Sequence, residues 1–137
     1  MALTGNIAPR RRGYARGDAF GYPVAPNEVV YTGGLTCVNA SGQAQRVQSA
    51  GSVAFIGIAT TGQNNTGSAV AGDNVVAAFD TYALTVPGAT PTNIGEPVYA
   101  SDDNTLTLTA PTTGFTGKVG YLAGIDNGQT YVRVTNA

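Results

Sequence analysis

The side chains best suited to binding gather near the amino end of the sequence. Guanidinium groups form paired hydrogen bonds with phosphates or carboxylates, and aromatic rings stack on bases or fill protein pockets. The arginines and aromatic residues near the amino end therefore predict a binding arm that contacts either nucleic acid or a neighbouring protein. Its candidate contact residues are Arg10, Arg11, Arg12, Tyr14, Arg16, Phe20 and Tyr22.

The charge of the remaining chain decides between these two partners. Residues 1–16 hold four arginines and no acid, whereas residues 17–137 hold three basic and eight acidic residues. Four phosphate contacts would lose roughly two decades of affinity between 50 and 200 mM salt, and an acidic body would repel nucleic acid. We therefore expect a protein neighbour rather than nucleic acid. A tail without function is the remaining alternative.

Catalytic and metal chemistry have few candidates. The sequence has no histidine, which excludes a Ser-His-Asp triad, a Cys-His pair and a histidine-ligated metal. Asp102-Asp103 could act as paired carboxylates, but the run Ser101 to Asn104 is typical of a plain turn. Cys37, in the apolar stretch Leu35 to Val38, is expected to be a buried, inert thiol. We expect neither an enzyme nor a metal site.

Cofactor and membrane signals are equally sparse. The glycines form no phosphate-binding loop, and the only lysine, Lys118, enters an expected strand, so no cofactor is expected. No apolar run approaches the roughly 18 residues of a membrane span, and the first twelve residues lack the apolar core of a signal peptide. The sequence therefore predicts no membrane association.

The elements that would position the arm follow from length and composition. The chain has 137 residues, enough for one domain, and 42% are hydrophobic, so a core is expected. Only 11% are charged, which fits a surface partly covered in an assembly. Proline and glycine without apolar periodicity predict an extended arm over residues 1–26, and short strand patterns predict a body over residues 27–137.

The body predicts an all-β fold of eight or nine short strands, arranged as a small barrel or sandwich. Asn127-Gly128 is a strong hairpin turn, and Gly57 marks a close approach within a strand buried on both faces. The further expected strands lie at 28–31, 35–38, 43–48, 53–59, 105–109, 119–123 and 131–134.

One segment is ambiguous between helix and strand. From Asp73 to Val86 there is no glycine or proline, and four apolar residues fall at helical spacing, Val75, Phe79, Tyr82 and Val86. The adjacent Val75-Val76 and the break at Asp80-Thr81 favour two short strands. We predict the two strands and keep the helix as the alternative.

A distinctive step in the body is Gly95-Glu96-Pro97-Val98-Tyr99-Ala100, which precedes an Asp/Asn turn. Further short apolar and glycine-containing segments lie at 55–59, 71–76, 82–88, 119–123 and 128–134. Together these segments resemble successive elements of the capsid decoration (cement) proteins of tailed bacteriophages. The resemblance covers roughly residues 28–134.

The resemblance implies a β-barrel-like fold without enzymatic activity, located on the capsid exterior of a virion. It further implies homotrimers at three-fold positions that reinforce contacts between major capsid proteins, with terminal arms reaching the shell. The arginine run itself is not part of the family pattern. The alternative function is a virion surface β module that recognises a receptor or a carbohydrate, although the sequence has no tryptophan for stacking on sugars.

Overall fold

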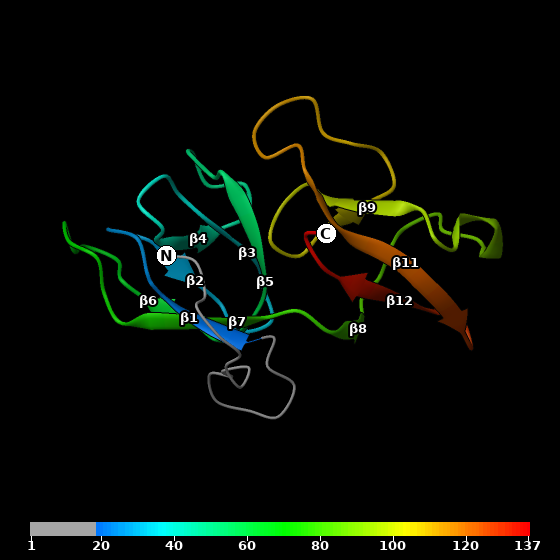
Figure 1. Cartoon of the computed structure of the whole chain (residues 1–137), viewed down its shortest axis with the longest axis horizontal. Helices are drawn as coiled ribbons and strands as arrows, with labels where there is room; N and C mark the ends of the chain where they lie inside the picture. Colours follow the sequence, from blue (N-terminus) through cyan, green and yellow to red (C-terminus); the bar gives the residue numbers. More distant parts are fainter. Residues whose placement is uncertain (1–18) are drawn as a thin grey trace, which may run out of the picture.

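Ten of the twelve strands in the described part of the chain form two five-stranded sheets, which are the two halves of the molecule in Figure 1, and the other two strands form a small third sheet. The computed structural model describes residues 19–137. Its elements are β1 (Ala19–Pro23), β2 (Val29–Val30), β3 (Leu35–Val38), β4 (Ala44–Arg46), β5 (Ala54–Thr61), β6 (Gln63–Asn64), β7 (Asn74–Ala78), β8 (Thr81–Ala83), the 3-10 turn η1 (Pro91–Asn93), β9 (Pro97–Ala100), β10 (Leu106–Thr107), β11 (Lys118–Asp126) and β12 (Gln129–Val134).

All strand pairs within the sheets are antiparallel. The first sheet has the order β1-β7-β5-β3-β4, the second the order β10-β9-β11-β12-β8, and β2 pairs with β6. The predicted all-β class is therefore confirmed, whereas the barrel or sandwich stays a prediction. The described residues contain more strands than expected because β1, β6 and β9 form where no strand was predicted, whereas β2 and β10 are shorter than the strands expected at 28–31 and 105–109.

The last part of the predicted arm belongs to the folded sheet. Ala19–Pro23 forms β1, paired with β7, and Val24 is only 1% exposed. The amide of Ala25 donates a hydrogen bond of 2.9 Å to the carbonyl of Ala44, so the chain passes from one edge of the first sheet to the other. A boundary at residue 26 is thus too late. The sequence does not reveal this strand, because its hydrogen-bonding partners in β7 lie more than fifty residues away.

The β3–β4 hairpin and the central strand β5 agree with the sequence. In the turn, the side-chain oxygen of Asn39 accepts hydrogen bonds from the amides of Ser41 and Gln43. Five successive residues of β5 are buried, and Gly57 adopts a φ of +120°. A side chain at Gly57 would collide with the carbonyl oxygen of Ala78, so the predicted close approach is confirmed.

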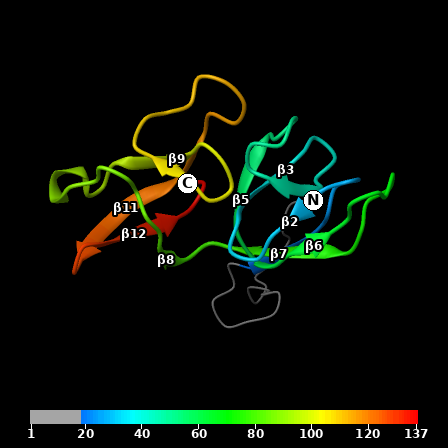
Figure 2. The ribbon, with the colours of Figure 1, turned by 180° about the vertical axis from the view of Figure 1, so that it is seen from behind.

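The ambiguous segment forms two strands, as predicted, and they join different sheets. Val75 and Ala77 of β7 face a core of the first sheet, and Tyr82 of β8 packs in the core between the sheets. The break at Asp80 is the point where the chain crosses from one sheet to the other. Figure 2 shows this crossing from behind.

Two apolar clusters lie on opposite sides of the first sheet. The larger one fills the space between the sheets and contains Phe55 and Leu122, both at most 2% exposed. The smaller one includes Val30 of β2 and Val75 of β7. The predicted hairpin turn at Asn127-Gly128 is also confirmed, since both residues have positive φ angles, 51° and 78°.

Candidate functional site

Five of the predicted arm residues lie outside the described part of the chain: Arg10, Arg11, Arg12, Tyr14 and Arg16. The other two, Phe20 and Tyr22, stand two positions apart in β1, with ring centroids separated by 5.2 Å. Phe20 is 47% exposed, whereas Tyr22 is half-buried against the smaller core. Burial raises the pKa of Tyr22. Tyr22 therefore anchors β1 to the body, and Phe20 presents an aromatic surface to the outside.

The strand that carries these rings lies at one end of the first sheet. In residues 19–137, β7 is the only named strand that pairs with β1. Pro23, which has no amide hydrogen, closes β1, as is usual for an edge strand. The element that follows the basic segment in the sequence is thus a hydrogen-bonded edge strand.

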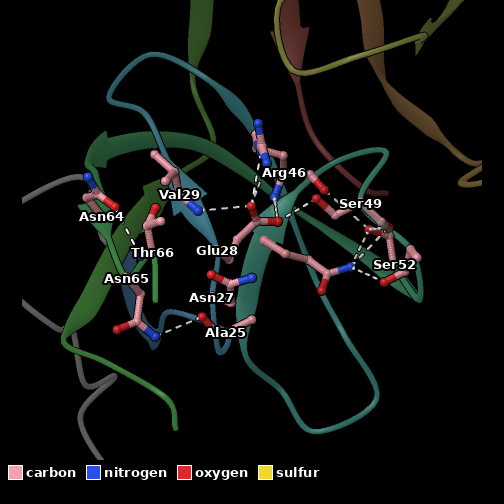
Figure 3. A network of polar contacts seen from close by, with 12 residues as sticks. Ala25, Asn27, Glu28, Val29, Arg46, Ser49, Ser52, Asn64, Asn65 and Thr66 are labelled. Carbon is pink, nitrogen blue, oxygen red and sulfur yellow. Dashed lines mark hydrogen bonds and ion pairs between the residues drawn. The ribbon is translucent and has the colours of Figure 1, made fainter. Parts of the chain in front are cut away.

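A buried carboxylate forms the centre of a polar network that sequence reasoning did not identify (Figure 3). Glu28, 7% exposed, receives hydrogen bonds from the amide of Val29, the hydroxyl of Ser49 and the guanidinium of Arg46. Burial by itself would raise the pKa of Glu28, but these hydrogen bonds and the Arg46 charge outweigh it and lower the pKa. The only sequence signal was a glutamate beside a hydrophobic strand.

This network stabilises loops and is poorly suited to catalysis. A carboxylate with a lowered pKa that already binds an arginine is a weak general base for the Ser49 hydroxyl. Next to it, the amide group of Gln45 donates to the carbonyls of Ser49 and Ala50 and to the hydroxyl of Ser52. The hydrogen bonds of Gln45, and that of Ser49 with Glu28, thus fix the segment between β4 and β5.

The paired carboxylates Asp102 and Asp103 lie in a turn, as predicted. One oxygen of Asp102 accepts from the amide of Asn104 at 2.8 Å and the other from the hydroxyl of Thr105 at 3.0 Å. The hydrogen bond from the Asn104 amide is the largest cause that lowers the pKa of Asp102. Three hollows of about 250, 280 and 320 Å³ meet at Asp103. Arg46 lines two of them, so their walls carry charges of both signs.

A second candidate surface, also missed from the sequence, lies on the outer side of the second sheet. Register aligns Lys118 with Tyr99, Tyr121 with Arg133, and Tyr131 with Ala83. Their neighbours Val98, Val119 and Val132 are fully buried, so these side chains point to the opposite face. We call this surface the tyrosine–cation face. It comprises Tyr99, Lys118, Tyr121, Tyr131 and Arg133.

Direct contacts order part of the tyrosine–cation face. The Lys118 ammonium lies 5.6 Å from the centroid of the Tyr121 ring, and the Tyr121 hydroxyl donates to the backbone oxygen of Ala137 at 3.1 Å. Arg133, directly opposite Tyr121, is exposed. Alternation within the strands at 119–123 and 131–134 and the hairpin turn at Asn127-Gly128 were the available signals, but the register shift between Leu122 and Gly124 decides that Tyr121 lies opposite Arg133.

The described residues contain no candidate metal site and no helix that could span a membrane. Within 19–137, no three histidine, cysteine, aspartate or glutamate side chains gather where they could hold a metal ion. No helix in the same range is long and apolar enough to cross a bilayer. Cys37 is fully buried, as predicted, and its pKa is raised to about 12 by burial, against a smaller lowering by a hydrogen bond with Ser52.

Comparisons of the chain with protein-family models, with curated proteins and with solved structures each found no match. The function is therefore inferred from the residues of the chain itself.

Proposed function

We propose that this chain is a non-enzymatic structural protein of a phage virion, which binds the outside of the assembled capsid and stabilises contacts between major capsid proteins. The observation that carries the proposal is the continuity between the basic segment and β1. The last arginine of the segment, Arg16, is three residues from Ala19, the first residue of an edge strand. A partner bound by the segment is thereby coupled to a hydrogen-bonded sheet.

The composition of the body supports an assembled state. Only 11% of the chain is charged, and Phe20, on the edge strand, is 47% exposed. Four of the six arginines lie in the basic segment, which together with the first strand also holds Tyr14, Phe20 and Tyr22, and arginine and tyrosine are residue types that dominate protein interfaces energetically. The polar network around Glu28 is engaged in fixing loops, which favours binding over catalysis.

Mass action explains how such binding stabilises a capsid. A protein that binds the assembled shell, but not its separated subunits, shifts the equilibrium toward the shell. In the homotrimer that we propose, each bound arm would raise the effective concentration of the other two. Weak individual contacts of four arginines could then give stable attachment.

The test uses shells that lack this chain. The full-length protein and a variant without residues 1–18 are added separately, and occupancy and the temperature of shell disruption are measured. We expect saturable binding of the full-length protein and a rise in disruption temperature, with at least about tenfold weaker binding for the truncated variant. Circular dichroism checks that the truncated variant is folded.

Two outcomes would contradict the proposal in different ways. Equal occupancy by the truncated variant would remove the role of the arm and leave the body as the binding element. Failure of the full-length protein to bind shells, together with saturable binding on a glycan array, would favour the alternative of a receptor- or carbohydrate-recognising module.

A further inference from the structure

We infer that the tyrosine–cation face is a second docking surface, which binds a carboxylate-rich patch on a protein partner. The identity of the partner rests on the proposed function, under which the carboxylate-rich patch belongs to the assembled coat. Through this face the folded body would contact the same coat that the amino-terminal segment binds.

The distribution of charge points to an acidic partner. Residues 19–137 contain three basic and seven acidic residues, and two of the three basic ones, Lys118 and Arg133, lie on this face. No acidic residue occupies a register position beside them. The paired positions are Tyr99 for Lys118, and Tyr121 and Thr81 for Arg133. A cationic face on an otherwise acidic body is complementary to carboxylates.

The aromatic content points to a protein. Tyrosine and arginine are enriched at energetically dominant positions of protein interfaces, and three tyrosines surround the two cations here. The Lys118 contact with the Tyr121 ring, and the hydrogen bond from Tyr121 to Ala137, hold that ring in place before any partner arrives. Less side-chain entropy is then lost on docking.

Nucleic acid fits this face less well. Two cations would neutralise about two phosphates, which corresponds to a salt slope near −1.8 and weak binding at physiological salt. The described body also carries an excess of four negative charges, which opposes a polyanion. A local carboxylate patch meets the cations without bringing a long charged backbone near the acids.

Lys118 makes the face directly testable, because it is the only lysine of the chain. Full-length protein bound to shells is treated with a zero-length carbodiimide, which joins amines to carboxylates in direct contact. We expect peptides that link Lys118 to aspartate or glutamate of the coat protein. The amino-terminal amine gives a different peptide and is counted separately.

Two matched variants measure how much the face contributes to binding. Arg133→Glu changes the charge of the face by two units, and the double variant Ala40→Glu with Ser41→Glu makes the same change in the exposed β3–β4 turn. We expect shell binding at least about tenfold weaker for Arg133→Glu and within about twofold of normal for the turn variant. If Arg133→Glu does not fold, Arg133→Gln should weaken binding severalfold.

The outcomes separate this inference from the proposed function. Binding of the full-length protein without a Lys118 link, and with Arg133→Glu equal to the turn variant, would overturn the docking face alone. No binding of the full-length protein to shells would overturn both. Retention of a single-stranded oligonucleotide that Arg133→Glu abolishes would replace the protein partner by nucleic acid.

Discussion

The guanidinium of Arg46 lies 2.8 Å from the carboxylate of Glu28, although the two residues are 18 positions apart. The pair is asymmetric, because the Arg46 side chain is 45% exposed and that of Glu28 only 9%. Arg46 can be solvated without its partner, whereas Glu28 depends on its hydrogen bonds with the protein. The contact joins the end of β4 to the residue before β2.

Replacement of Glu28 by glutamine should destabilise the fold at neutral pH by about 1–3 kcal/mol. The glutamine amide would present hydrogen-bond donors where Arg46 and Ser49 already donate. The free energy of unfolding, measured with urea at pH 7, checks this value. The variant Gln63→Ala, which removes one solvent-exposed hydrogen bond, is the control and should change stability by less than about 0.5 kcal/mol.

Acid should remove the same stabilisation. The pKa of Glu28 is lowered in the folded protein from its ordinary value of 4.5, so its contribution is present above that value. It is lost as the pH falls through the folded-state pKa. The stability difference between the unaltered protein and Glu28→Gln should therefore shrink between pH 6 and pH 3. A difference that grows on acidification would contradict this assignment.

Gln48 should contribute to the attachment between the sheets. Its side-chain amide donates to the carbonyls of Ala100 and Phe115, and its oxygen accepts from the Phe115 amide at 3.0 Å. Gln48→Ala removes three hydrogen bonds that join the loop after β4 to Ala100 in β9 and to Phe115 in the loop between β10 and β11. We expect a loss of about 1–3 kcal/mol in urea unfolding, and a loss below about 0.5 kcal/mol would show that these contacts are replaced by water.

Gly57→Ala should destabilise the protein by more than about 2 kcal/mol. The residue has a φ of +120°, and its new methyl group would meet the Ala78 carbonyl. The matched control is Gly124→Ala in β11, where a Cβ has no neighbour within 4 Å. Thermal unfolding compares the two variants, and equal melting temperatures would refute the close approach at Gly57.

The Cys37 thiol should resist modification in the folded protein. Burial raises its pKa to about 12, so little thiolate exists at pH 8. We expect reaction with a disulfide reagent at least about a hundredfold slower in buffer than in 6 M urea. Rapid modification in buffer, with unchanged circular dichroism, would show that the thiol is accessible in the native state.

The place of a truncation should determine its effect on stability. Removal of residues 1–22 takes four of the five residues of β1, including Tyr22, whereas removal of residues 1–18 leaves β1 intact. We expect the longer truncation to be less stable than the shorter one by at least about 2 kcal/mol, since buried aromatic surface of Tyr22 is lost. Equal urea midpoints would mean that β1 contributes nothing to the body.

Local patterns were sufficient for much of the fold. The β3–β4 turn, the hairpin at Asn127-Gly128 and the two strands within Asp73 to Val86 depend on residues adjacent in sequence. Turn chemistry and alternation act over a few residues, so the sequence alone determines them. The exclusion of histidine chemistry and the basic character of the first sixteen residues are likewise properties of the sequence.

Long-range pairing decided the rest. β1 becomes a strand because β7 offers it a partner, Glu28 acquires its role only when β4 brings Arg46 beside it, and Lys118, Tyr121 and Arg133 share one face only through the register of the second sheet. Periodicity assigns side chains to a face of their own strand, but it does not state which strand lies beside it. That choice belongs to the packing of the whole chain, because the free energy of pairing distant strands comes from contacts between residues far apart in sequence.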